Sequence, residues 1–93
     1  DLFATNKGYI LNQNTPNPAV DLTSFEFVIP AKSNLTIQVY NVNGQLMTTL
    51  LNNEVQEGTH QVELNVSNFS NGTYFVTMIS DSVVLTRKMT VLK

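Results

Sequence analysis

Acid–base or nucleophilic chemistry in this chain would have to use His60, the single histidine among the 93 residues. A nucleophilic triad needs a serine, a histidine and a carboxylate within hydrogen-bond reach, and His60 is the only base available to one. His60 shares its sequence parity with Val62 and Leu64, while Gln61 and Glu63 have the opposite parity. This alternation is typical of a strand with one buried face. We therefore interpret His60 as a structural side chain at the rim of a core.

The other groups that could bind a metal, a cofactor or a phosphate are scattered along the chain. The seven carboxylates occur singly and there is no cysteine, whereas zinc and calcium sites need several clustered ligands. The four glycines stand alone rather than in a phosphate-binding loop. We expect no metal, no cofactor and no enzymatic activity.

Charge and composition argue against two further classes of protein. Five Lys and Arg residues stand against seven Asp and Glu residues, a formal net charge of -2, whereas nucleic-acid binding depends on several basic residues that neutralise phosphates. The longest apolar runs, such as Phe27-Val28-Ile29, are far shorter than the roughly 20 residues of a membrane helix. We expect no nucleic-acid partner and no membrane span. The 34 Asn, Thr, Ser and Gln residues favour an extracellular β domain.

Residue periodicity predicts strands throughout the chain. There are 26 β-branched residues against three alanines, and no window has a sustained helical spacing of apolar residues. Alternating or apolar runs predict strands at 9–12, 23–29, 35–40, 45–51, 60–66, 73–79 and 83–92. The run 73–79 is apolar on both faces, so we predict that it is central in its sheet. About seven strands at this spacing predict an all-β fold, an immunoglobulin-like antiparallel β-sandwich.

Glycines mark the expected turns at Gly44, Gly58 and Gly72. Asn43-Gly44 is the strongest short hairpin signal, because both central residues of such a two-residue turn take a positive φ. The run Gly72-Thr73-Tyr74 is similar to a tyrosine corner, in which the phenol bonds to upstream backbone. An ordinary core tyrosine fits the same residues, so both interpretations remain open.

The chain length predicts one domain. Residues 1–8 show no alternation, and we assign 1–10 to the end of a linker and 11–93 to the sandwich. Because residue 1 is Asp and no signal-peptide pattern follows, we expect the chain to be a mature piece of a longer protein. Without cysteine, the domain must rely on its apolar core alone for stability.

Five segments, read in order, resemble one known family, the type A C-terminal sorting domain of the bacterial type IX secretion system. These segments are Leu11–Pro18, Leu35–Gln45, Gly58–His60, Ser70–Phe75 and Lys88–Lys93. Together they extend the resemblance over residues 11–93. Two positions depart from the family pattern: Ala19 stands where an aromatic residue is common, and Asn65 where an aspartate is common.

The resemblance implies that the domain is carried at the end of a larger cargo protein and crosses the outer membrane with it. The implied partners are the type IX secretion machinery, both its outer-membrane translocon or shuttle and its sortase, and the upstream cargo domain of the same chain. A cell-surface sortase usually removes such a domain, and the cargo is released or attached to the cell surface. A fibronectin-like or carbohydrate-binding accessory module and a structural spacer are the alternatives with the same fold.

The same resemblance assigns recognition by the translocon to residues near both ends of the sandwich. They are Pro16, Asn17, Pro18, Lys88, Val91 and Lys93. The two prolines fix φ at about -65° and favour extended residues before them, so we predict a stiff, non-pairing segment at 14–18. This segment is either a rigid turn or a contact surface. The two lysines either meet an acidic receptor or protect an edge strand from aggregation.

Proteolytic processing is expected within or just before residues 1–10. A protease needs an extended, accessible segment, and small or polar residues occur at Ala4, Thr5 and Asn6.

Overall fold

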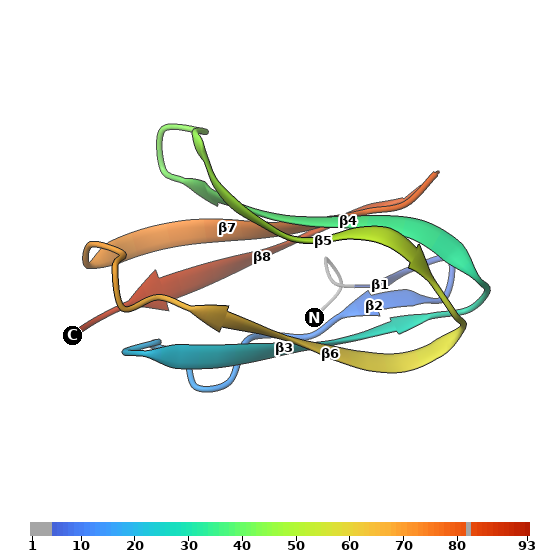
Figure 1. The fold of residues 1–93 in the computed structure, drawn as a ribbon, viewed down its shortest axis with the longest axis horizontal. Coiled ribbons are helices and arrows are strands. Elements are labelled where there is room, and N and C mark those ends of the chain that lie inside the picture. Colours follow the sequence, from blue (N-terminus) through green and yellow to red (C-terminus); the bar gives the residue numbers. More distant parts are fainter. Residues whose placement is uncertain (1–4, 82) are drawn as a thin grey trace.

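The computed structural model describes residues 5–81 and 83–93 as an all-β sandwich (Figure 1). The strands are β1 (Thr5–Asn6), β2 (Tyr9–Leu11), β3 (Leu22–Ile29), β4 (Ser33–Asn41), β5 (Leu46–Val55), β6 (Gly58–Asn65), β7 (Gly72–Ile79) and β8 (Val84–Val91). All seven expected strands are present, and the two-residue strand β1 adds to them. Within the described ranges no helix is long and apolar enough to cross a membrane.

Two four-stranded sheets face each other, with the orders β1-β2-β3-β6 and β5-β4-β7-β8. Every neighbouring pair of strands in both sheets is antiparallel. The chain passes from one sheet to the other after β3, after β5 and after β6. This arrangement confirms the predicted immunoglobulin-like sandwich. It also confirms the central position of β7, which lies between β4 and β8.

The core lies between the two sheets and is formed by alternate residues of their strands. The strands that contribute most of the buried side chains are β3, with Phe25, Phe27 and Ile29, β4, with Leu35, Ile37 and Val39, β7, with Tyr74, Val76 and Met78, and β8, with Leu85, Met89 and Val91. Each fully buried aliphatic or aromatic side chain contributes about 1.5–3 kcal/mol relative to an exposed one. In a domain without disulfides, this layer supplies most of the stability that offsets chain entropy.

The turn after β4 differs from its prediction. Gly44 has φ 81°, but Asn43 does not share a positive φ, so the two-residue turn expected at Asn43-Gly44 is wrong. The loop is one residue longer: Gly44 N donates to Asn41 O at 3.0 Å, and Asn41 N donates to Gln45 O at 3.0 Å. Asn41 Oδ1 also accepts from the backbone N of Asn43 and of Gln45 at 2.9 and 3.0 Å. These bonds favour the three-residue loop with glycine in its left-handed position.

The first hairpin lies inside the segment that the sequence assigned to a linker. Thr5 pairs with Ile10 and Asn6 with Tyr9, and β2 pairs in turn with β3. Lys7 and Gly8 form the turn with φ of 54° and 87°. A Lys-Gly pair is a weaker hairpin signal than Asn-Gly, which explains why this turn was not predicted. Residues 5–10 are therefore part of a sheet, whereas a linker before them stays a prediction.

Tyr74 forms the tyrosine corner. Its hydroxyl donates to Ser70 O at 2.8 Å, and its side chain is 6% exposed. The ring also packs on Phe69, with 4.9 Å between the ring centroids. These contacts join the connection between β6 and β7 to the start of β7, which decides between the corner and an ordinary core tyrosine.

We predict that Tyr74→Phe lowers the free energy of unfolding by about 1 kcal/mol, because it removes one hydrogen bond to a backbone carbonyl but keeps the ring. The matched control is Tyr40→Phe, whose half-buried hydroxyl donates to Gln38 Oε1 at 2.8 Å, two residues away on the same strand. Urea unfolding of both variants measures the difference. Equal losses in the two variants would contradict a special role for the corner.

Candidate functional site

The segment 13–19, here called the proline loop, connects β2 to β3 and contacts both sheets. Thr15 pairs with Ser24 of β3 through two backbone hydrogen bonds of 2.9 Å. Ala19 forms an isolated parallel bridge with Val91 of β8. The peptide bonds that precede Pro16 and Pro18 are cis. The prediction that residues 14–18 do not pair is therefore wrong for Thr15.

A buried polar network inside this loop holds its shape. Asn14, which is 3% exposed, donates from Nδ2 to Pro16 O at 2.9 Å and to Thr23 Oγ1 at 3.0 Å. Thr23 Oγ1 donates to the same Pro16 carbonyl at 2.9 Å. Asn14 Oδ1 accepts from Gln13 Nε2 at 2.7 Å. Since buried polar groups are costly when left unpaired, this set of bonds favours one loop conformation over others.

A row of hydrogen bonds joins the start of the sandwich and the proline loop to β8. Arg87 Nε donates to Leu11 O at 2.9 Å, Gln13 Nε2 to Lys88 O at 2.7 Å, Thr90 N to Asn17 Oδ1 at 3.2 Å, Ala19 N to Thr90 O at 2.8 Å, and Leu92 N to Ala19 O at 3.0 Å. Asn17 and Thr90 are 73 residues apart in the sequence. The first and last segments that carried the family resemblance are thus one structural unit.

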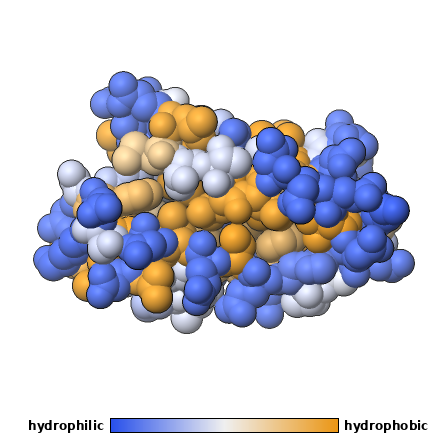
Figure 2. All heavy atoms as spheres, in the orientation of Figure 1, coloured by the Kyte–Doolittle hydropathy of each residue, from blue (hydrophilic) through white to orange (hydrophobic). Residues whose placement is uncertain are grey.

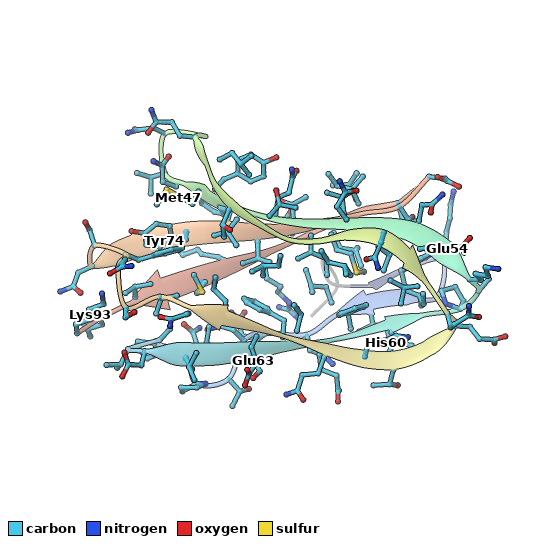
Figure 3. All side chains as sticks on the ribbon, viewed as in Figure 1. Met47, Glu54, His60, Glu63, Tyr74 and Lys93 are labelled. Atoms are coloured by element: carbon cyan, nitrogen blue, oxygen red, sulfur yellow. The ribbon has the colours of Figure 1, made fainter. Side chains whose placement is uncertain are left out.

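Lys93 is held by the connection between β6 and β7. Its Nζ donates to Ser67 O and to Phe69 O, both at 2.6 Å, and its backbone N donates to Asn71 Oδ1 at 3.0 Å. Figure 3 shows Lys93 and Tyr74 at the same end of the sandwich. The ammonium group of Lys93 therefore already has two carbonyl partners, whereas no such contact engages the exposed side chain of Lys88 among the described residues.

The structure separates the predicted recognition residues by exposure. Pro16, Asn17, Pro18 and Lys88 are exposed, as is Lys93, whereas Val91 is 1% exposed. In the folded domain the Val91 side chain packs in the core, so it is not available for direct contact with a partner. Its expected part in recognition stays a prediction.

Two further apolar side chains lie beside the Ala19 bridge. Val20 follows Ala19 and is 53% exposed, and Leu92, whose backbone bonds to Ala19, is 58% exposed. We call the group of Pro16, Pro18, Val20, Lys88 and Leu92 the terminal surface. It combines apolar side chains with one cationic group, a composition suited to a protein contact.

Sequence reasoning missed the residues that support this surface. Thr23 has the inward parity of Phe25 and Phe27, and a polar residue at a core position needs a buried partner. Arg87 likewise has the inward parity of Leu85 and Met89 in β8, but it is half-buried and bonds to the opposite sheet. Both signals were present in the alternation, although neither identifies the partner.

The remaining predicted positions lie elsewhere. Gly58 and Gly72 are the first residues of β6 and β7, with φ of 124° and 150°.

His60 is half-buried, stacked on Phe27 with 5.5 Å between ring centroids, and its Nε2 lies 2.7 Å from Gln56 O. The described residues contain no group of three or more His, Cys, Asp or Glu side chains that could hold a metal ion.

Of the residues in the candidate processing region, Thr5 and Asn6 form β1, and Ala4 lies outside the described residues. The backbone of Thr5 and Asn6 is paired with β2 on one side, and β1 is the edge strand of its sheet. Processing in this region stays a prediction.

These features define an immunoglobulin-like module whose first and last segments together form a candidate recognition surface. The chain belongs to the family of secretion system C-terminal sorting domains (Por_Secre_tail), whose family model matches residues 15–92. The matched range includes Pro16, Pro18, Lys88 and Leu92 of the terminal surface. A comparison with curated proteins gave no match. The resemblance that the sequence motifs indicated is confirmed.

We predict that Asn14→Ala lowers the free energy of unfolding by about 1–3 kcal/mol, because Pro16 O and Thr23 Oγ1 lose a buried donor. Asn12→Ala is the control, since Asn12 Nδ2 makes an exposed bond of 3.2 Å to Glu26 Oε1. Thermal unfolding followed by circular dichroism compares the two. A loss for Asn14→Ala no larger than that of Asn12→Ala would refute the role of the buried network.

Proposed function

We propose that this domain is the address that directs a larger cargo protein through the type IX secretion system and across the outer membrane. Membership of the sorting-domain family over residues 15–92 is the observation that carries the proposal. In this function the chain is a signal and a substrate of the secretion machinery, and it catalyses no reaction itself. The cargo is then released or attached at the cell surface.

The terminal surface is the part of the domain that we assign to the translocon or shuttle protein. Its apolar residues supply contact area that loses water on binding, and Lys88 supplies charge complementarity with an acidic receptor. Lys93 has a different role, because its ammonium group is bonded to the carbonyls of Ser67 and Phe69. It fixes the end of β8 and thereby the position of Leu92.

The carbohydrate-binding alternative is not favoured. Sugar-binding platforms use exposed aromatic faces, whereas Phe25, Phe27 and Tyr74 are buried and Tyr40 and Phe75 are half-buried.

The first experiment fuses residues 1–93 to an inert, periplasm-directed reporter in a cell with type IX machinery. Export to the outside is expected.

Lys88→Gln should reduce export while the thermal midpoint of the isolated 93-residue chain hardly changes, because a single exposed charge contributes about 0–1 kcal/mol to stability. Lys93→Gln should lower the midpoint, because it removes an ammonium donor from two carbonyls.

A reporter that stays periplasmic, while an established sorting domain exports it in the same cells, would refute the sorting function. If Lys88→Gln is exported like the unmodified fusion, Lys88 is removed from the recognition surface. An unchanged midpoint in Lys93→Gln would refute the structural role assigned to that lysine.

The second experiment locates the sortase cut. A protease binds an extended, accessible segment, and residues 5–6 and 9–11 are paired in a sheet. We therefore place the cut before Thr5, at the upstream side of the expected processing region. Mass spectrometry of the mature cargo terminus measures the position, and a cut at any position after Thr5 would contradict the proposal.

A further inference from the structure

The two long edges of the sandwich differ in whether hydrogen bonds join the two sheets there. At one edge, the bonds from β8 to Leu11, Gln13 and Ala19 join the two sheets. At the other edge lie β5 and β6, which are the last strands of their sheets and do not pair with each other. Figure 2 shows a band of apolar side chains along this face, between the two sheets and flanked by hydrophilic residues. At the β5–β6 edge, the backbone of two edge strands and a band of apolar side chains between the sheets are therefore accessible.

Irregular pairing protects only half of β5. Register shifts leave Met47 and Leu50 without a partner in β4, and such bulges twist a strand away from further pairing. From Leu51 to Val55 the register is continuous against Ser33–Ile37. This half contains no Lys or Pro, the residues that commonly block an edge strand. A regular, unprotected edge thus remains at 51–55.

A cavity of about 350 Å³ opens beside that same half of β5. Leu51, Asn53 and Val55 line it from β5, His60 and Val62 from β6, and Phe27 from β3. Its volume lies at the lower end of the roughly 300–1,000 Å³ typical of small-ligand sites, which leaves room for one large side chain or two small ones. An extended peptide added to β5 would direct alternate side chains toward this cavity, because successive residues of a strand point to opposite faces.

The charges around the open edge are mostly negative. Residues 50–66 include Glu54, Glu57 and Glu63 and no Lys or Arg, whereas β8 and the residues after it include Arg87, Lys88 and Lys93. Lys32 is the nearby cation, and its Nζ lies 3.6 Å from Glu54 Oε1. Figure 3 shows Glu54 and His60 toward the opposite end of the sandwich from Lys93. Charge complementarity therefore favours a basic partner at the β5–β6 edge.

We propose that the β5–β6 edge binds an extended, basic segment of a partner polypeptide by strand addition to Leu51–Val55. Backbone hydrogen bonds to the free edge supply affinity, and one apolar side chain of the partner enters the cavity over Phe27 and supplies specificity. The carboxylates of Glu54 and Glu57 select neighbouring Lys or Arg residues of the partner. This second surface is distinct from the terminal surface, and it does not depend on the export function.

The test is a nuclear magnetic resonance titration of the isotope-labelled 93-residue chain with nine-residue synthetic peptides. Each peptide alternates Thr and Lys around one central Val, Leu, Ile or Phe. Binding should shift the amide signals of residues 51–55 and 60–62 and slow amide hydrogen exchange in 51–55. A peptide with Glu in place of Lys should bind at least about tenfold more weakly. Added salt should weaken the binding of the basic peptide.

Two substitutions of like residues separate the edge from general charge effects. Asn53→Lys places a cation at the cavity and should weaken peptide binding at least about tenfold. Asn43→Lys adds the same charge at an exposed position in the loop between β4 and β5, which does not line the cavity, and should change affinity less than about twofold. Thermal midpoints of both variants confirm that each is folded.

Three results would overturn the proposal. They are the absence of binding by every basic peptide at millimolar concentration, equal effects of Asn43→Lys and Asn53→Lys, and signal shifts centred on β8 instead of β5 and β6. Analytical ultracentrifugation adds a fourth, since a concentration-dependent dimer abolished by Asn53→Lys would assign the edge to a second copy of the chain.

Discussion

The domain depends on the hydrogen bonds that join its first and last segments around the buried Asn14. This side chain fixes the carbonyl of Pro16 and the hydroxyl of Thr23, and its oxygen positions Gln13, which reaches the backbone of β8. Without these bonds the prolines would still stiffen the loop, but only the bonds of Asn17 and Ala19 would set its position against the last strand among the described residues. The terminal surface thus depends both on this buried polar network and on the bonds of Asn17 and Ala19 to the end of the chain.

The contacts between the proline loop and β8 are one reason why the two edges of the sandwich differ. A sheet edge exposes unpaired backbone groups that invite association, and at β8 the Ala19 bridge covers part of them. At β5 the fold uses two bulges instead, which leave residues 51–55 regular. Charge follows the same division, with cations on β8 and carboxylates near the open edge. Each edge therefore offers a different chemistry to a partner.

Much of the fold could be predicted from the sequence, because strand alternation reports which face of a strand is buried. The runs at 23–29, 35–40 and 73–79 lie within observed strands, and the two apolar faces of 73–79 correctly indicated a central strand. The loop at Asn43-Gly44 was wrong in its length, because the Asn41 side chain stabilises a longer loop that residue type alone does not reveal. Pairing between Gln13 and Lys88 is a long-range contact, which periodicity cannot predict.

The sequence could predict where the candidate site lies, but not which of its residues are free for a partner and which are bonded within the domain. Lys88 and Lys93 are equivalent in the sequence, yet Lys93 bonds to Ser67 and Phe69 while Lys88 points to solvent. The two halves of the terminal surface come from opposite ends of the amino-acid sequence, so the surface exists only after the chain has folded. If the secretion machinery binds this surface, its affinity for the cargo is coupled to the stability of the sandwich. Binding would then select folded domains over unfolded ones, and a loss of export in any variant carries information about recognition only when its stability is measured as well.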